Sequence, residues 1–353
     1  MNEPLDTLWY TNSPAPTGLG IAAQTGRLAE AFRATGTSIQ DLRGSGEREV
    51  RQAHFNQHLT NSVRHGSSVA AIWAHANGNP THLLGVSWCD EVQLILTTAE
   101  SGVSSVRDLK NRRFGLPKWA NVQIDFTRAQ ALRSLENALR LEGLEVADVE
   151  LVDYPYGGIH SDDWMNYVAG TPLAFSGNQI VRRNNELIGL LRGDIDAIFL
   201  KGAGAVNLAR EFGLHVIIDT GSHPEPLVRA NNGTPRTLTV DHGLIERHYD
   251  SAVRLVDTVL RAEQWAWAHP EETCRLLARE MNTSERQVIA AHGEFFHRQL
   301  RTSLDEGPLR ALQDFADFLL RWRFIDTRLD VGEWIDARPL HDVLGGNPVR
   351  LAR

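Results

Sequence analysis

Three side chains near the start of the chain have the chemistry to bind or transform a small acid. Arg64 carries a planar guanidinium whose fork of donors fits the oxygens of a sulfinate, sulfonate or carboxylate. His54 can donate to the same anion or move a proton near neutral pH. Ser13 carries a hydroxyl, which needs a dedicated base to act as a nucleophile. On residue type alone, a surface arginine and a helix-capping serine remain the alternatives for Arg64 and Ser13.

Two further histidines leave the role of His54 open. His58 and His65 compete with it for proton transfer, and His54 and His58 have the four-residue spacing of a helical metal pair. No third ligand with suitable spacing follows. We therefore interpret the pair as two solvated histidines on an exposed helix face, and we expect neither a metal nor a cofactor.

The segments around these residues predict strand ends that lead into helices. Ser13 follows the apolar run 8–10 and precedes two prolines, which favours an extended loop at the carboxyl end of a strand. Thr17 or Ser13 then caps a helix over residues 18–34. Asn12, next to Ser13, joins the candidate ligand-binding residues.

Gly66 and Ser67 precede the apolar run 69–74 and are expected to begin a second helix. The free N–H groups of such a helix end would face the anion beside Arg64. An ordinary serine-capped helix is the alternative and is compatible with that role.

Short apolar runs alternate with longer helical patterns along the first two thirds of the chain, which predicts an α/β protein with mostly parallel strands. The expected strands contain residues 8–10, 83–86, 94–96, 114–116, 149–152, 197–200 and 216–218. The expected helices cover residues 124–142, 184–191, 203–212, 240–267, 270–281, 284–296 and 308–322. The last four make the C-terminal third helix-rich.

The length of 353 residues favours two lobes. We expect the chain to cross between them twice, so that residues 1–98 and 220–353 form lobe one and residues 99–219 form lobe two. Ligands of such open sheets bind outside the carboxyl ends of the strands. Lys118, Trp119 and Lys201 are expected to face the cleft from lobe two, with a position on its rim as the alternative.

Composition excludes several classes of protein. The net charge of −8 is spread along the chain without a basic cluster, so nucleic acid is not an expected partner. The two cysteines, Cys89 and Cys274, are expected to be buried and free. The N-terminus has no signal-peptide pattern and no run is long enough to span a bilayer, so we expect a soluble, cytoplasmic protein without membrane insertion.

Three stretches resemble the type-2 periplasmic binding proteins for sulfonates, nitrate and thiamine precursors. They are SVRDLKNRRFGL from residue 105, LRGDIDAIF from residue 191, and WAWAHPEE from residue 265. The resemblance implies two lobes with a ligand cleft between them. It supports the fold and not the activity.

The N-terminal part is similar to the 2'-hydroxybiphenyl-2-sulfinate desulfinases in a more specific way. YTNSPAP from Tyr10 resembles their first-strand loop, with Ser13 where those enzymes have a cysteine. His54-Phe55 and, ten residues beyond His54, Arg64-His65-Gly66-Ser67 are similar to their His-Phe and Arg-Phe-Gly-Gly elements at the same separation. The resemblance implies carbon–sulfur bond hydrolysis, with His54 and Arg64 holding a sulfinate and Ser13 in the nucleophile position.

Two hypotheses follow. The first is an enzyme of the sulfinate-desulfinase type that acts on a small aryl or alkyl sulfinate. The second is a substrate-binding protein or sensor that closes on a sulfonate, sulfinate or carboxylate without chemistry, with a transporter as its partner. The serine favours the second hypothesis, because a cysteine becomes a thiolate far more readily than a serine becomes an alkoxide.

Overall fold

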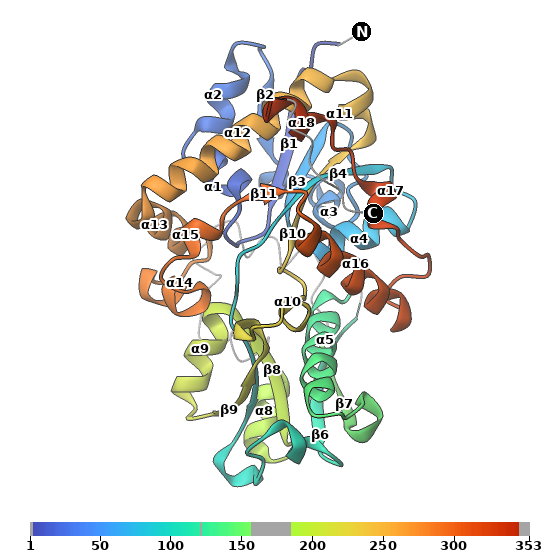
Figure 1. Ribbon diagram of the computed structural model, residues 1–353, viewed down its shortest axis with the longest axis vertical. Helices are drawn as coiled ribbons and strands as arrows, with labels where there is room; N and C mark the ends of the chain where they lie inside the picture. The colour runs from blue at the N-terminus through green and yellow to red at the C-terminus, as the bar shows by residue number, and fades with distance from the viewer. Residues whose placement is uncertain (1–2, 121, 157–184, 346–353) are drawn as a thin grey trace. The chain divides into compact units, whose positions relative to one another are not determined.

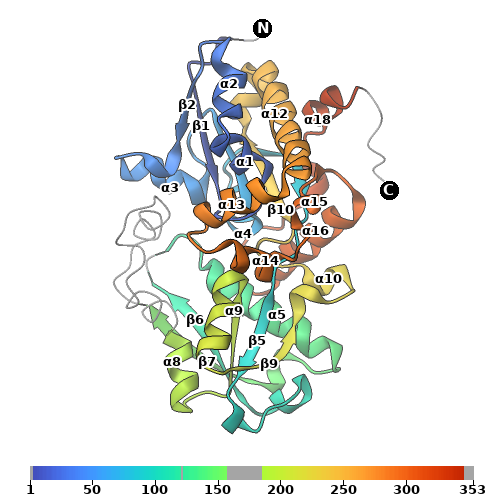
Figure 2. The same cartoon turned by 90° about the vertical axis from the view of Figure 1, so that its left-hand side faces the viewer.

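The computed structural model describes residues 3–120, 122–156 and 185–345. The chain packs into two compact units (Figures 1 and 2): unit 1 comprises residues 1–89, 232–285 and 295–353, and unit 2 comprises residues 90–231 and 286–294. The sequence predicts the first crossing after residue 98. In the structure β5 (Gln93–Thr97) pairs with β8 (Ala197–Lys201) and β9 (His215–Asp219) of unit 2, so the crossing precedes this strand. The return crossing follows residue 231 rather than residue 219, and residues 286–294 also belong to unit 2, so the chain passes between the units four times rather than the expected two.

Unit 1 is built on a mixed sheet with the order β11-β4-β10-β3-β1-β2 in the described part of the chain. β1 is parallel to β2 and β3, whereas β10 is antiparallel to β3 and β4. The expectation of mostly parallel strands is therefore wrong for this sheet, because β10 enters it on the return of the chain from unit 2. The strands are β1 (Thr7–Asn12), β2 (Ser38–Asp41), β3 (Ser62–Ser67), β4 (Thr81–Ser87), β10 (Arg236–Asp241) and β11 (Thr302–Ser303).

Helices cover this sheet, and those of the C-terminal third confirm the expected helix-rich region. They are α1 (Gly18–Gln24), α2 (Arg27–Arg33), η1 (Leu42–Gly44), α3 (Arg48–Asn56), α4 (Ser68–Ala76), α11 (His242–Arg247), α12 (Tyr249–Ala268), α13 (Pro270–Glu280), α15 (Phe296–Gln299), α16 (Glu306–Arg321), α17 (Val331–Trp334) and α18 (Arg338–Val343).

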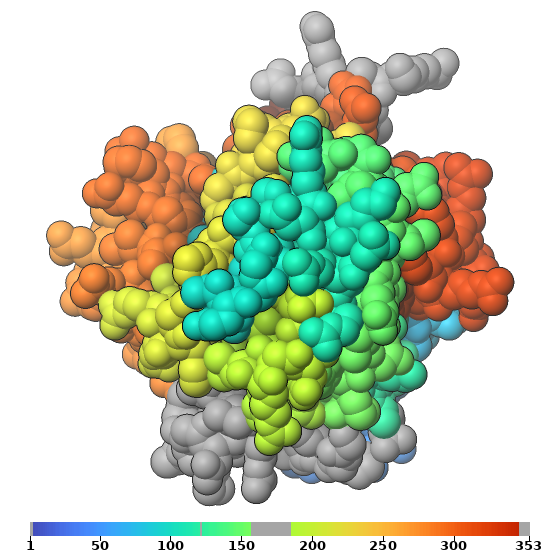
Figure 3. Space-filling model, turned by 90° about the horizontal axis from the view of Figure 1, so that it is seen from below, coloured from blue at the N-terminus to red at the C-terminus, as the bar shows by residue number. Residues whose placement is uncertain are grey.

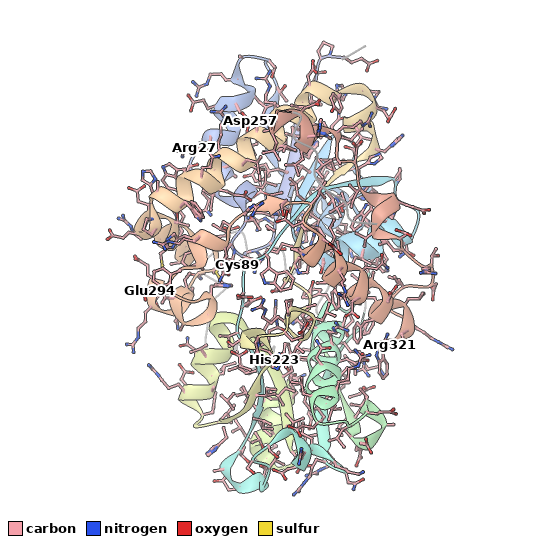
Figure 4. All side chains as sticks on the ribbon, in the orientation of Figure 1. Arg27, Cys89, His223, Asp257, Glu294 and Arg321 are labelled. Atoms are coloured by element: carbon pink, nitrogen blue, oxygen red, sulfur yellow. The ribbon has the colours of Figure 1, made fainter. Side chains whose placement is uncertain are left out.

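The single helix predicted over residues 18–34 is instead two helices. Gly26 has a φ of 76°, which interrupts the chain between α1 and α2. Both helices pack against α12, where Arg27 lies over the ring of Trp265 at 4.7 Å; Figure 4 labels Arg27 on α2 and Asp257 on α12.

Unit 2 contains a sheet with the order β7-β6-β8-β5-β9, in which β6 is parallel to β7 and β8 while β5 is antiparallel to β8 and β9. η2 and η3 lie on the end of this unit that Figure 3 shows in teal. Its elements are η2 (Ala99–Ser101), η3 (Val106–Leu109), β6 (Arg113–Trp119), α5 (Phe126–Leu141), η4 (Val146–Asp148), β7 (Glu150–Tyr156), α8 (Asn185–Arg192), β8 (Ala197–Lys201), α9 (Gly202–Glu211), β9 (His215–Asp219), η6 (Thr220–Ser222), α10 (Pro226–Arg229) and α14 (Glu285–His292), whose first residue belongs to unit 1.

The expected strands and the helices around 124–142, 184–191 and 203–212 are all confirmed, and Gly193 and Gly213 have the positive φ values of helix ends. Cys89 and Cys274 are buried and free, as expected. Trp9, Trp73 and Trp88 lie in apolar runs of the sequence but are only partly buried. No helix in the described ranges has the length and apolar character to cross a membrane.

Candidate functional site

The carboxyl ends of β1 and β3 bring the candidate residues of unit 1 together. These parallel strands pair Thr11 with Arg64 and Asn12 with His65. Because side chains alternate between the faces of a sheet, Thr11 and Arg64 share one face and Asn12 and His65 share the other. α3 covers the first face, and α1 lies against the second, where the backbone N–H of Leu19 donates to His65 Nδ1 at 3.5 Å.

Arg64 is the most deeply buried cation of this group, with 2% of its surface exposed. Its Nε donates to the carbonyl oxygen of His54 at 3.1 Å, and its Nη1 is buried and has no hydrogen-bond partner among the described residues. Burial lowers the pKa of Arg64 to about 10, so the guanidinium is still charged at neutral pH. A buried cation with an unused donor is a natural place for an anion. The alternative of a surface arginine is therefore wrong.

His54 lies on α3 and is buried, contrary to the prediction that it is solvated. Its Nδ1 is 2.7 Å from Thr11 Oγ1. Burial, with the charges of Arg64 and Arg43, lowers its pKa well below 6.5, so the imidazole is neutral at pH 7. His58 does not share its helix face, because α3 ends at Asn56 and Gln57 has a φ of 49°. Across the described ranges, no three His, Cys, Asp or Glu side chains are arranged to hold a metal.

Ser13 lies directly beyond β1, against the end of β3. Its Oγ accepts a hydrogen bond from the backbone N–H of Ser67 at 3.0 Å and lies 3.2 Å from Ser67 Oγ. A Cβ on Gly66 would be 2.2 Å from this oxygen, so the absence of a side chain at Gly66 makes room for Ser13. Ser13 is not the cap of the following helix, because Thr17 Oγ1 accepts from Gly20 N at 3.1 Å and fills that role.

α4 begins at Ser68 with Ser67 as its N-cap residue, whereas Gly66 and Ser67, which were expected to begin this helix, are the last two residues of β3. Two of the N–H groups at this end already have partners within the protein. Ser67 N donates to Ser13, and Val69 N donates to Asn232 Oδ1 at 3.1 Å. Ser67 itself makes no side-chain cap, so the interpretation as an ordinary serine-capped helix is wrong.

Asn12 connects Ser13 to a buried carboxyl group that the sequence does not reveal. Its Nδ2 donates to Glu280 Oε1 and, at 3.3 Å, to the carbonyl oxygen of Ser13, and Glu280 Oε2 accepts from Gln24 Nε2 at 2.8 Å. Burial raises the pKa of Glu280 to about 7, an effect that the charge of Arg43 partly offsets.

His65 is a structural histidine rather than a rival of His54. It is completely buried, and its Nε2 lies 3.0 Å from Ser87 Oγ. Burial lowers its pKa to about 3, with contributions from Arg236 and Arg64, so it remains neutral throughout the physiological range.

The three candidate residues of unit 2 have partners within that unit. Lys118 pairs with Asp153 at 2.7 Å, Lys201 pairs with Glu91 at 2.8 Å, and Trp119 stacks on Tyr156 with a centroid separation of 4.6 Å. Their contact with a ligand remains a prediction.

The sequence reasoning missed Thr11, Arg43 and Glu280. Thr11 had a usable signal, since it directly follows the predicted strand 8–10 and precedes Ser13 by two positions, so in an extended chain both side chains point the same way. Arg43 follows β2, a strand too polar to be recognised by its hydrophobic pattern. Glu280 had no signal, because it lies 268 positions from Asn12 in the sequence.

The two mixed sheets and their helices define a protein with the fold of type-2 periplasmic binding proteins, as predicted. The aliphatic sulfonate binding protein SsuA from Escherichia coli has this fold, with a TM-score of 0.66, 15% sequence identity, and coverage of 94% of this chain and 92% of that chain. No family model matches the sequence.

The resemblance to the 2'-hydroxybiphenyl-2-sulfinate desulfinases is also confirmed. The enzymes from Rhodococcus erythropolis and Rhodococcus qingshengii are each 25% identical over 361 aligned residues, which cover 96% of this chain and 94% of theirs. A crystal structure of a Cys-to-Ser mutant of DSZB in complex with biphenyl-2-sulfinic acid has a TM-score of 0.75, 24% identity, and coverage of 97% of this chain and 99% of that chain.

Proposed function

We propose that this protein binds a small aryl or alkyl sulfinate at the ends of β1 and β3 and hydrolyses its carbon–sulfur bond. The observation that carries the proposal is Arg64, a buried guanidinium with an unused Nη1 and no ion-pair partner among the described residues. The similarity to sulfinate desulfinases over most of the chain indicates which anion to expect.

In this proposal Arg64 binds the sulfinate oxygens and His54 lies beside them as a neutral imidazole. Hydrolysis replaces the bond between carbon and sulfur with a bond between carbon and hydrogen. Water supplies that proton and a hydroxide for the sulfur, so the products are the hydrocarbon and bisulfite. When Ser13 is the nucleophile, its Oγ bonds to sulfur while its hydroxyl proton passes to the departing carbon, which leaves a sulfite ester on Ser13. Water then hydrolyses this ester, releases bisulfite and restores the hydroxyl. The N–H of Ser67 stabilises negative charge on Ser13 Oγ.

One observation favours binding without chemistry as a second candidate function. The hydrogen-bond partners of Ser13 Oγ in the described part of the chain are the N–H and the hydroxyl of Ser67, neither of which is a base. A serine without a base is a poor nucleophile. The same site would then serve a substrate-binding protein or sensor for a sulfinate or sulfonate.

The test combines calorimetry with an assay of sulfite release, using benzenesulfinate, biphenyl-2-sulfinate and the corresponding sulfonates. We expect the wild type to bind the sulfinates and to release sulfite. Arg64→Lys keeps the positive charge but loses the paired N–H donors of the guanidinium. It should therefore weaken the binding of the sulfinates by roughly tenfold or more. Arg33→Gln, at an exposed arginine of α2, is the control. Binding without sulfite selects the second candidate, and no binding of any of these acids refutes both.

A further inference from the structure

Arg43 lies at the same edge of the sheet as Ser13. It belongs to η1, the short turn that follows β2, and Asp41 at the end of β2 pairs with Tyr10 of the parallel strand β1. The carboxyl ends of β2, β1 and β3 are therefore neighbours in the sheet, and they carry Arg43, Ser13 and Ser67 respectively. This edge is where open α/β sheets bind their ligands.

The contacts of Arg43 fix its guanidinium but leave part of it unused. Its Nη2 donates to Asn12 Oδ1 at 3.2 Å, and its Nε lies 3.5 Å from Asp41 Oδ1. Only 11% of the side chain is exposed, and Nη1 is buried without a hydrogen-bond partner among the residues that the structure describes. An unpaired buried donor is costly, so a ligand that supplies an acceptor is strongly favoured.

The positive charge of Arg43 also shifts the pKa values of groups near Ser13. It lowers the pKa of His54 together with Arg64, and it opposes the burial that raises the pKa of Glu280. Two guanidiniums therefore act on the same imidazole, and each keeps a buried, unused Nη1.

The Nε of Arg64 is committed to the carbonyl oxygen of His54, so its terminal nitrogens are the donors left for a ligand. One guanidinium binds an acid group through two parallel N–H groups, and the two or three oxygens of a sulfinate or sulfonate then keep further lone pairs for a second donor. We propose that Arg43 is a second anion-binding residue of this site, which pairs with oxygens of the bound organosulfur acid that Arg64 leaves unpaired. This inference rests on the proposed function, since it concerns the same ligand.

Arg43 could have a purely structural role, in which its contact with Asn12 only holds η1 in place, and this role makes a different prediction from a role in binding. Arg43→Lys keeps the positive charge but loses the paired N–H donors of the guanidinium, whereas Arg43→Gln loses both the charge and these donors. Arg51→Gln is the matched control, because Arg51 on α3 donates to the backbone of Ser45 and Gly46 and so ties the same turn to the neighbouring helix.

The experiment measures the dissociation constants of benzenesulfinate and benzenesulfonate by calorimetry, and the melting temperature of each variant. We expect Arg43→Gln to weaken binding of both probes by roughly tenfold or more, Arg43→Lys by less, and Arg51→Gln to leave it within about twofold. Equal losses of affinity in Arg43→Gln and Arg51→Gln would overturn the inference, and so would an unchanged affinity in Arg43→Gln.

The failure of this inference differs from the failure of the proposed function. A wild type that binds neither probe refutes the proposed function and the inference with it. If the wild type binds the probes, Arg64→Lys binds them at least about tenfold more weakly, and Arg43→Gln binds them normally, the proposed function stands and only this inference is refuted.

Discussion

Thr11 Oγ1 lies 2.7 Å from Nδ1 of His54, a contact between the first strand and a helix 43 positions further along the chain. It occurs on the face of the sheet that also carries Arg64, whose Nε bonds to the backbone of the same histidine. The ring and the backbone of His54 are thus each held by one residue of a neighbouring strand. Both contacts fix the imidazole beside the unused donor of Arg64.

Replacing Thr11 with Val should impair the site through His54. Val keeps the shape of Thr and removes the hydroxyl, so the buried Nδ1 loses its partner, at a cost of about 1–3 kcal/mol. We expect the affinity for benzenesulfinate, and any rate of sulfite release, to fall roughly five- to tenfold, as measured by calorimetry and sulfite assay. Thr11→Ser keeps the hydroxyl and should behave like the wild type. Equal effects of the two substitutions would show that packing, not the hydrogen bond, matters at this position.

The sequence singled out Ser13, His54 and Arg64 as candidates, because their types and spacing resemble those of an enzyme family, and their role in binding stays a prediction. It also predicted most helices and strands, since their apolar periodicity is strong. It was wrong about the environment of His54, because the helical spacing of His54 and His58 does not reveal which face of α3 packs on the sheet. The contact between Glu280 and Asn12 could not be predicted from the sequence, because these residues come together only in the folded chain.

Replacing Ser13 with Cys should create or strengthen desulfinase activity. The backbone N–H of Ser67, 3.0 Å from the oxygen at this position, would donate to a thiolate, and nearby positive charges lower the pKa of a thiol. We expect sulfite release to rise at least about tenfold over the wild type, because thiolates form more readily than alkoxides. Ser13→Ala should still bind benzenesulfinate without turnover. The native cysteines Cys89 and Cys274 are buried, so alkylation that blocks only the Cys variant would locate the activity.

Replacing Gly66 with Ala should displace Ser13. The new Cβ would lie 2.2 Å from Ser13 Oγ and 2.9 Å from Ser13 N, and the backbone atom cannot move aside cheaply. We expect a loss of about 1–3 kcal/mol in the free energy of unfolding and a marked loss of anion binding. Gly44→Ala is the control, because the nearest atom to its Cβ is 4.0 Å away. Denaturant titration and calorimetry measure both effects, and normal binding by Gly66→Ala would contradict the placement of Ser13.

His54 should remain neutral in the folded protein as the pH falls, and this should lower the free energy of unfolding. Burial and the nearby arginines lower its folded pKa well below 6.5, whereas the unfolded chain takes up this proton near 6.5. The unfolded state then binds more protons, so the free energy of unfolding should decrease as the pH falls through 6.5. His54→Gln should make that decrease shallower in denaturant titrations between pH 5 and 7. An NMR titration that places the His54 pKa near 6.5 would refute the prediction.

Glu280 should have the opposite effect on the pH dependence of stability. Burial raises its folded pKa from 4.5 to about 7, so between these values the folded state binds the proton more tightly than the unfolded chain. Its contribution to stability is present below about pH 4.5 and is lost as the pH rises to about 7. Relative to Glu280→Gln, the wild type should therefore lose on the order of 3 kcal/mol across this interval.

Glu263→Gln provides a parallel measurement, because burial also raises the pKa of Glu263 on α12 to about 7 and its carboxyl group accepts from Thr302 instead of Asn12. Its difference from the wild type should follow the same pH interval, and the two effects should add, since the carboxyl groups have separate hydrogen-bond partners. Of the two variants, Glu280→Gln alone should also change the affinity for benzenesulfinate, because Glu280, unlike Glu263, accepts a hydrogen bond from Asn12 next to Ser13. Parallel stability curves for the wild type and Glu280→Gln between pH 4.5 and 7 would mean that the folded state holds no extra proton there.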